Sequence, residues 1–322
     1  MIYSILKWIT GIALYWFYRD IRVENKQAIP AAGPLLIAVN HPNALVDALI
    51  AAWIIPRRVG MTAKATLTDN PLVAAIFRLL DVVPLRRTSD ERERSGPGVD
   101  PSRNAGAFRE ILSLLERGGA VLIFPEGKSH SEAELAPLKS GLARLALMAR
   151  DESGIRGLRI LPMGLVFEDK GNPGSLVGAR IGKPIEMDSW DGKNHQDLTM
   201  EIARRLSSMS NEAVIPDTSD IVGRDHHAFN KHLIGVAAWW GRLTHRFPIR
   251  MARNLAVRRS TNPDEPAMLT IMFGLGFVLL TYVVHLAVIG VVAGSALVVV
   301  AYLVTLLAGA YWAAFEEHPR RY

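Results

Sequence analysis

The chain has 322 residues, of which 49% are hydrophobic, and it carries a formal net charge of +6. This length is enough to bury one substantial core with residues left over. The absence of cysteine excludes disulfides and thiolate catalysis, so the composition gives no sign of an oxidising compartment. A basic balance suits nucleic acid as well as anionic lipid, and the distribution of apolar residues decides between them.

The first apolar segment runs from Ile2 to Tyr18, carries one charge at Lys7 and ends in an aromatic cluster. It has no small-residue cleavage site, which argues against a removed signal peptide. The segment is short for crossing a bilayer, and aromatic residues favour the membrane interface. We therefore predict a monotopic or half-inserted membrane-interface helix over 1–19, with a full span left open.

The next segments place a histidine and an aspartate around a turn. A short apolar run typical of a buried strand precedes His41, and a stretch of helical length and composition follows Asn43. On one uninterrupted helix His41 and Asp47 would be about 120° away from a shared face, so they meet only if the chain bends between them. Pro42 and Asn43 supply that bend, with Asn43 as a candidate helix cap. The pattern indicates a general base oriented by a carboxylate, or a histidine with a structural role.

Residues 20–215 alternate between strand and helix patterns, which predicts one α/β domain. The predicted strands are 20–25, 34–40, 58–64, 120–124, 159–167 and 178–182, and the predicted helices are 44–55, 70–80, 104–117, 138–151 and 195–210. Gly118 and Gly119 are expected to end one of these helices as left-handed cap residues. The charged stretch 86–103 is rich in Gly, Pro and Ser, which predicts a mobile loop or lid.

A second loop with candidate functional residues follows the strand 120–124. Pro125 and Gly127 favour a tight turn there. Its polar side chains are Glu126, Lys128, Ser129 and His130. Such a loop presents backbone donors and cations to an anion, although an ordinary turn after a strand has the same appearance.

Residues 231–259 combine arginines with aromatic and aliphatic residues at helical spacing. Arg242, Arg246, Arg250 and Arg253 alternate with Trp239, Trp240, Leu243 and Phe247, and Pro248 marks a predicted kink. This indicates a basic amphipathic helix on anionic lipid, with a merely solvated face as the alternative. His226, His227 and His232 match no zinc-ligand spacing, so no metal site is predicted.

From Ala267 to Phe315, His285 is the only ionisable side chain apart from tyrosines. One helix of this length would be about 73 Å long, so we predict two spans near 267–286 and 292–314 that turn around Gly290 to Ser295. The alternative is a buried hairpin of a soluble protein. Arginines before and after the hairpin favour the cytoplasmic side for both of its ends.

Four parts are therefore expected along the chain. They are the membrane-interface helix (1–19), the α/β domain (20–215), a basic amphipathic linker (216–262) and a transmembrane hairpin with its tail (263–322). The protein is expected to be integral to the inner or cell membrane, with its α/β domain on the cytoplasmic side.

Five motifs follow one another between His41 and Phe167. They are HPNALVD (41–47), VPLRRTSD (83–90), FPEGKSHSE (124–132), PLKSG (137–141) and ILPMGLVF (160–167). In this order they resemble the four sequence blocks of the glycerolipid acyltransferases, with PLKSG as an extension of the third. That superfamily acylates glycerol 3-phosphate and lysophosphatidate, and the resemblance extends from Pro30 to roughly Pro184. It implies an α/β fold with a mixed sheet flanked by helices.

Two departures resemble one subgroup of that superfamily. Five residues separate His41 from Asp47, where the commoner pattern has four, and Gly127 is followed by Lys-Ser-His where the commoner block reads FPEGTRS. Both features are similar to those of the fungal glycerol-3-phosphate and dihydroxyacetone-phosphate acyltransferases and their bacterial relatives. Ser129 stands where the commoner pattern has an arginine that binds phosphate, so the resemblance leaves the acceptor open.

The resemblance implies an enzyme that transfers a fatty acyl group from acyl-CoA or acyl carrier protein to glycerol 3-phosphate. It implies His41 as the general base and Asp47 as the carboxylate that orients it. Phosphate binding is expected from Arg87 and Lys128, with Arg86 and Lys139 as neighbours, and a role in binding or organising the acceptor site from Asn43, Glu126, Gly127, Ser129 and His130. No cofactor, metal or nucleic acid is expected. Lysophosphatidate or another lysolipid is the alternative acceptor, and a membrane lipid-binding scaffold is the alternative without catalysis.

Overall fold

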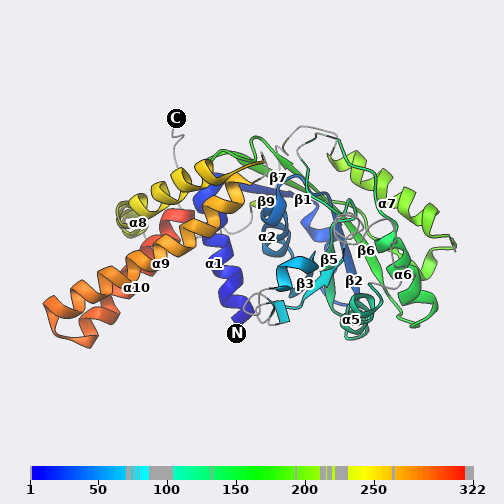
Figure 1. The fold of residues 1–322 in the computed structure, drawn as a ribbon, viewed down its shortest axis with the longest axis horizontal. Coiled ribbons are helices and arrows are strands. Elements are labelled where there is room, and N and C mark those ends of the chain that lie inside the picture. Colours follow the sequence, from blue (N-terminus) through cyan, green and yellow to red (C-terminus); the bar gives the residue numbers. More distant parts are fainter. Residues whose placement is uncertain are drawn as a thin grey trace.

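A computed structural model describes residues 2–69, 74, 77–78, 80–86, 104–130, 132, 134–192, 194–210, 215, 220–221, 231–262 and 265–315. A group of long helices projects from one side of an α/β domain (Figure 1). The predicted loop 86–103 lies outside the described residues except for Arg86, and so does most of the predicted helix 70–80.

A nine-stranded mixed sheet forms the centre of the α/β domain. Its strands are β1 (Asp20–Glu24), β2 (Leu35–Val39), β3 (Val59–Lys64), β4 (Val82–Leu85), β5 (Ala120–Ile123), β6 (Arg159–Phe167), β7 (Leu176–Ile181), β8 (Ile185–Glu186) and β9 (Asp220–Ile221). The order is β4-β3-β5-β2-β6-β7-β1-β9, with β8 paired to β6. Neighbours from β4 to β6 are parallel, whereas β7 and β8 are antiparallel to β6. The mixed α/β sheet implied by the family resemblance is confirmed.

Helices cover both faces of this sheet. One face packs against α1 (Ile2–Phe17) and α2 (Ala44–Ile54), and the other packs against α5 (Ala105–Glu116), α6 (Gly141–Asp151) and α7 (His195–Ser210). The central strand β2 is buried on both faces. Its continuous apolar run therefore reflects a parallel strand between two helical layers, and this location fixes the residues that follow its end.

Most of the predicted elements are present within two or three residues of their expected ends. The strand 159–167 and the helix 195–210 coincide with β6 and α7. Gly118 has a φ of 72°, as expected for the left-handed residue after α5. The sequence interpretation missed β4, β8 and β9, because two of them are only two residues long and β4 contains a proline.

Three helices form the projecting part of the molecule. They are α8 (Lys231–Arg259), α9 (Pro266–Ala293) and α10 (Ala296–Phe315), and the last two are long and apolar enough to cross a membrane. Gly294, with a φ of 61°, ends α9. The predicted turn around Gly290 was too wide, since Gly290 is still helical and its carbonyl accepts the hydrogen bond that caps the helix.

Helix α8 packs against the hairpin along a line of small residues. Ala238, Ala252 and Ala256 are buried in this contact, and a Cβ on Gly241 would lie 1.9 Å from the carbonyl oxygen of Gly309. Only glycine permits that close approach. Large apolar side chains lie exposed on α8, among them Val236, Trp239, Leu243 and Phe247. Helix α8 therefore packs one apolar face on the hairpin and exposes both apolar side chains and arginines to its surroundings. Its contact with anionic lipid stays a prediction.

Candidate active site

The end of β2 is fixed by an asparagine side chain. Asn40 follows the strand, and its Nδ2 donates to the carbonyl oxygen of Leu165 (2.9 Å) while its Oδ1 accepts from the amide of Leu165 (2.7 Å). These two hydrogen bonds extend the β2–β6 pairing by one residue, with the Asn40 side chain in place of the backbone. The residue after Asn40 is His41, which is therefore held firmly at the carboxyl end of the central strand.

The chain bends directly after this point and brings His41 and Asp47 together. The Nδ1 of His41 lies 3.0 Å from Oδ2 of Asp47. The same oxygen accepts from the amide of Asn43 (2.7 Å), which closes the bend. Ala44 has a φ of 46°, in the region that residues with a side chain rarely adopt. Such strain is tolerated where the surroundings impose it, commonly at functional sites.

Asn43 occupies the position before α2, but its side chain does not cap the helix as predicted. Its Nδ2 donates instead to the hydroxyl of Tyr18 (2.8 Å) and to the carbonyl oxygen of Lys170 (3.2 Å). The Nζ of Lys170 in turn donates to the carbonyl oxygen of Pro42 (2.9 Å). Sequence reasoning missed Tyr18 and Lys170, since their contacts with Asn43 span 25 and 127 positions of the chain.

Both members of the pair are buried, and an aromatic side chain covers the imidazole ring. The ring of His41 stacks on Phe124, with centroids 3.8 Å apart and planes 10° from parallel. Asp47 is fully buried, and burial raises the pKa of its carboxyl, opposed by the hydrogen bond with His41. An ionised Asp47 accepts a hydrogen bond from Nδ1–H of His41, which leaves Nε2 as the basic nitrogen. This arrangement can accept a proton from a hydroxyl and stabilise the imidazolium that results.

The loop after β5 is joined to His41 through a buried glutamate. Oε1 of Glu126 accepts from the amide of His41 (2.7 Å), and Oε2 accepts from the amide of Ala136 (2.8 Å) and contacts Nε2 of His130. The amide of His130 donates to the carbonyl oxygen of His41 (3.2 Å). Gly127, with a φ of 80°, makes the tight turn that the sequence predicts. Glu126 therefore ties the two loops together, and both of its oxygens are engaged within the protein.

Replacing Glu126 with alanine is expected to destabilise the fold by about 2–4 kcal/mol, because the amides of His41 and Ala136 would lose a charged acceptor inside the protein. Thermal unfolding followed by tryptophan fluorescence measures this change. Glu134→Ala is the matched control, since Glu134 is exposed in the same loop and its loss should change stability by less than about 0.5 kcal/mol. Equal melting temperatures for the two variants would contradict the organising role of Glu126.

The predicted phosphate-binding cations are placed less completely. Lys128 and Lys139 are exposed, and the amide of Lys139 donates to the carbonyl oxygen of Pro125 (2.7 Å). Arg86 is exposed directly after β4, at the same edge of the sheet as His41 but three strands away, which is about 14 Å. Arg87 lies outside the described residues. The structure therefore joins Asn43, Glu126 and His130 to the His41–Asp47 pair by hydrogen bonds, and leaves the phosphate site as a prediction.

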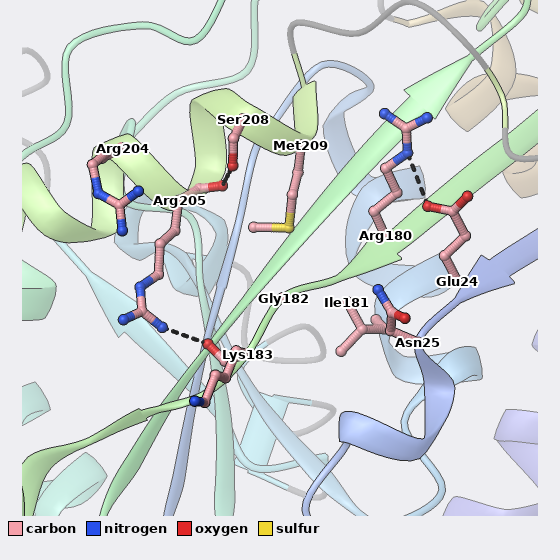
Figure 2. A pocket seen from close by; sticks show the side chains of 10 residues that line it. All are labelled: Glu24, Asn25, Arg180, Ile181, Gly182, Lys183, Arg204, Arg205, Ser208 and Met209. Carbon is pink, nitrogen blue, oxygen red and sulfur yellow. Dashed lines mark hydrogen bonds and ion pairs between the residues drawn. The ribbon is translucent and has the colours of Figure 1, made fainter.

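A separate basic hollow of about 560 Å³ lies between the ends of β1, β7 and α7. Figure 2 shows its four cations, Arg180, Lys183, Arg204 and Arg205, pointing in different directions. Arg180 pairs with Glu24 (3.2 Å), and Arg204 and Arg205 both pair with Glu201. None of the predicted site residues lines this hollow. Sequence reasoning did not find this hollow. Its arginines already form ion pairs with Glu24 and Glu201, which distinguishes it from a substrate phosphate site.

Within the described ranges, no group of three His, Asp or Glu side chains could hold a metal ion. His226 and His227, whose spacing predicted no zinc site, lie outside those ranges. Ser175 is a buried hydroxyl, and its Oγ contacts the carbonyl oxygens of Asp169 (2.5 Å) and Asn172 (2.8 Å) as a donor. These bonds give Ser175 a turn-forming role.

Comparison with known proteins finds similar sequences and a similar structure. The acyltransferase family model matches residues 20–166. Glycerol-3-phosphate O-acyltransferase 2 of Saccharomyces cerevisiae is 31% identical over 103 residues, which are 32% of this chain and 14% of that protein. A 1-acyl-sn-glycerol-3-phosphate acyltransferase of Bacillus subtilis is 27% identical over 130 residues, which are 40% of this chain and 58% of that protein. The crystal structure of the 1-acyl-sn-glycerophosphate acyltransferase of Thermotoga maritima overlaps 64% of this chain and 77% of its own, with a TM-score of 0.47 and 18% identity.

Residues 20–166 therefore match the acyltransferase family, and both of these relatives are glycerolipid acyltransferases by name. The motifs that indicated the resemblance lie between His41 and Phe167, almost entirely within the matched region. The chain spans less than two thirds of the length of either relative.

Proposed function

We propose that the protein is a membrane-bound enzyme that transfers a fatty acyl group from acyl-CoA or acyl carrier protein to the hydroxyl of glycerol 3-phosphate. The observation that carries this proposal is the 3.0 Å contact between His41 Nδ1 and Asp47 Oδ2 at the end of β2. In this role His41 is the general base and Asp47 the group that orients it. Similarity to the glycerolipid acyltransferases supports the reaction class, and the subgroup features around His41 and Gly127 support glycerol 3-phosphate.

The proposed reaction needs no covalent enzyme intermediate, because a thioester is already activated. Nε2 of His41 takes the proton of the acceptor hydroxyl as its oxygen attacks the thioester carbonyl. The carbon–sulfur bond then breaks, and the imidazolium returns the proton to the leaving thiolate. Asp47 stabilises the imidazolium between the two proton transfers. The chain has no cysteine that could serve as an alternative nucleophile.

The acceptor phosphate is proposed to bind Arg87 and Lys128, with Arg86 and Lys139 nearby. Arginine offers two parallel donors to a phosphate, and lysine offers a compact charge. The exposed positions of Arg86, Lys128 and Lys139 support a site that is open to a soluble acceptor. Glu126, Gly127, Ser129 and His130 are proposed to hold the shape of the loop beside this site.

The second candidate acceptor is lysophosphatidate. The Bacillus subtilis relative supports it, because its name gives this acceptor and its match covers more of both chains than the match to the yeast protein does. The two acceptors share the phosphate and differ by one acyl chain. A panel of acceptors therefore separates them, together with dihydroxyacetone phosphate and other lysolipids.

We expect the purified chain in lipid vesicles to release thiol from palmitoyl-CoA when glycerol 3-phosphate is added. A thiol reagent reads coenzyme A without background, since the protein contains no cysteine. Arg87→Gln should raise the KM for glycerol 3-phosphate by about 10–100-fold, because a charge-assisted bidentate contact is lost. Arg109→Gln, in α5, is the control for loss of charge. If none of the acceptors in the panel supports thiol release, a lipid-binding scaffold becomes the remaining hypothesis.

We also propose that the enzyme is integral to the inner or cell membrane, with the α/β domain on the cytoplasmic side. The two apolar helices and the arginines that flank them support this arrangement. The proposed boundaries of the four parts remain those at residues 19, 215 and 262.

A further inference from the structure

An apolar groove of about 320 Å³ lies where α1 meets the projecting helices α8, α9 and α10. Its volume is at the lower end of the range for sites that bind organic ligands. The walls include Ile12 and Trp16 of α1 and Ile271, Gly274, Leu275 and Leu279 of α9. The groove is separate from the basic hollow of Figure 2, with which it shares no residue.

The charged side chains of the groove are two arginines of α8. Arg250 and Arg253 both line the groove. Ala252, which lies between them in α8, is close to α9, since a Cβ on Gly274 would be 4.0 Å from the Cβ of Ala252. The other end is marked by Tyr282, whose hydroxyl lies 2.7 Å from Nε2 of His245. The two arginines place permanent positive charge at the end near the α/β domain, where Arg253 contacts Asn172.

The length of the groove matches one leaflet of a bilayer. Its lining extends along α9 from Thr270 to Tyr282, which is about 18 Å at 1.5 Å per residue. Half of a typical hydrocarbon core is about 15 Å. A lipid with its headgroup at Arg250 of α8 and its acyl chain along α9 toward Tyr282 therefore keeps the headgroup at the depth of the α/β domain and the tail within one leaflet.

A short segment connects the groove to the catalytic bend. Pro173 lines the groove, and its neighbour Asn172 accepts from Nη2 of Arg253 (3.4 Å). Three residues before Pro173, Lys170 donates to the carbonyl oxygen of Pro42, beside His41. The amide of Gly174 donates to the carbonyl oxygen of Phe17, another wall residue (2.7 Å). The headgroup end of the groove is thus adjacent in the chain to the segment that supports the His41 turn.

We propose that this groove binds a single-chain glycerophosphate lipid, with its acyl chain along α9 and its phosphate at Arg250 and Arg253. The apolar walls fit the chain, and the two arginines fit the phosphate. The identification of this lipid as lysophosphatidate, the reaction product on its way into the leaflet, rests on the proposed function. Acylation of glycerol 3-phosphate adds one chain and keeps the phosphate, which is the chemistry that the groove accommodates.

Photolabelling of the full chain in phosphatidylcholine vesicles tests the site without requiring turnover. The probe is lysophosphatidate with a diazirine in its acyl chain, and peptide mass spectrometry locates the adducts. We expect adducts on the lining residues of α1 and α9. A lysophosphatidylcholine probe with the same chain should label them about fivefold less, because it carries no net negative charge.

Two matched pairs of variants sharpen the test. Gly274→Leu places a side chain in the groove and should lower groove labelling about tenfold, whereas Gly276→Leu, two residues along α9 and outside the lining, should leave it unchanged. Arg250→Gln should reduce labelling by lysophosphatidate to the level of lysophosphatidylcholine. Arg246→Gln, an exposed arginine of the same helix outside the groove, should not.

Equal labelling of the two glycine variants, or adducts mainly on outward residues such as Val291 and Leu297, would overturn the proposal. So would equal labelling by the two probes. His41→Asn separates this inference from the proposed function, since it should stop acyl transfer and leave groove labelling intact. Labelling of the groove by a chain that transfers no acyl group to any acceptor would support the lipid site and reject the enzyme reaction.

Discussion

The His41→Ala variant is expected to lose acyl transfer by about 10²–10⁴-fold, the contribution of a well-placed general base. The loss should appear in kcat, because the imidazole acts when the acceptor proton moves and not when the donor binds. Palmitoyl-CoA cleavage in vesicles, measured at saturating glycerol 3-phosphate, gives this value. The removed ring also stacks on Phe124 and bonds Asp47, so a lower rate by itself does not isolate the base.

His41→Asn provides that isolation. An asparagine at this position can donate from its amide to Oδ2 of Asp47, as Nδ1 of the imidazole does, but it has no basic nitrogen. We expect this variant to melt within a few degrees of the unmodified chain and to be as inactive as His41→Ala. Activity above about a tenth of the unmodified rate in His41→Asn would refute proton transfer by His41, and the site would then be one that orients substrates only.

Local pattern was sufficient to predict the turn that brings His41 and Asp47 together. The apolar run before His41 is buried on both sides, as a central parallel strand requires, and the bend after it supplies the contact with Asp47. These features depend on residues close together in the chain, so propensity and turn chemistry determine them. The same reasoning predicted β6 and α7 with correct ends, since both have long periodic patterns.

What the sequence could not supply was pairing between distant segments. Tyr18 reaches Asn43 across 25 positions, and Glu126 reaches the amide of His41 across 85. Asn43 illustrates the effect, because its local propensity predicts a helix cap while its buried side chain bonds Tyr18 and Lys170. The two-residue strands β8 and β9 likewise exist through their partners β6 and β1. Tertiary contacts override local preference at such positions.

Asp47→Asn is the second change with a large expected effect, a loss of about 10²–10³-fold in kcat. Oδ1 of the new amide can accept from Nδ1–H of His41 and from the amide of Asn43, so the geometry of the bend is kept. The negative charge that stabilises the imidazolium is lost. A rate within about threefold of the unmodified chain would contradict the orienting role of Asp47.

Although Asp47→Asn lowers activity, it should raise the stability of the fold at neutral pH relative to the unmodified chain. The direction follows from the pKa of Asp47. Burial raises this pKa in the folded protein, so the folded state holds the proton more tightly than the unfolded chain does. The free energy of unfolding therefore falls as the pH rises from the ordinary aspartate value near 3.9 through the raised value, and the penalty persists at neutral pH.

The asparagine variant has no such penalty, although its amide nitrogen would occupy the site of Oδ1, which has no partner among the described residues. Its melting temperature relative to the unmodified chain should thus increase between about pH 4 and about pH 7. A relative decrease over that interval would mean that Asp47 stabilises the fold in its charged form, and that the carboxylate is kept for structure more than for catalysis.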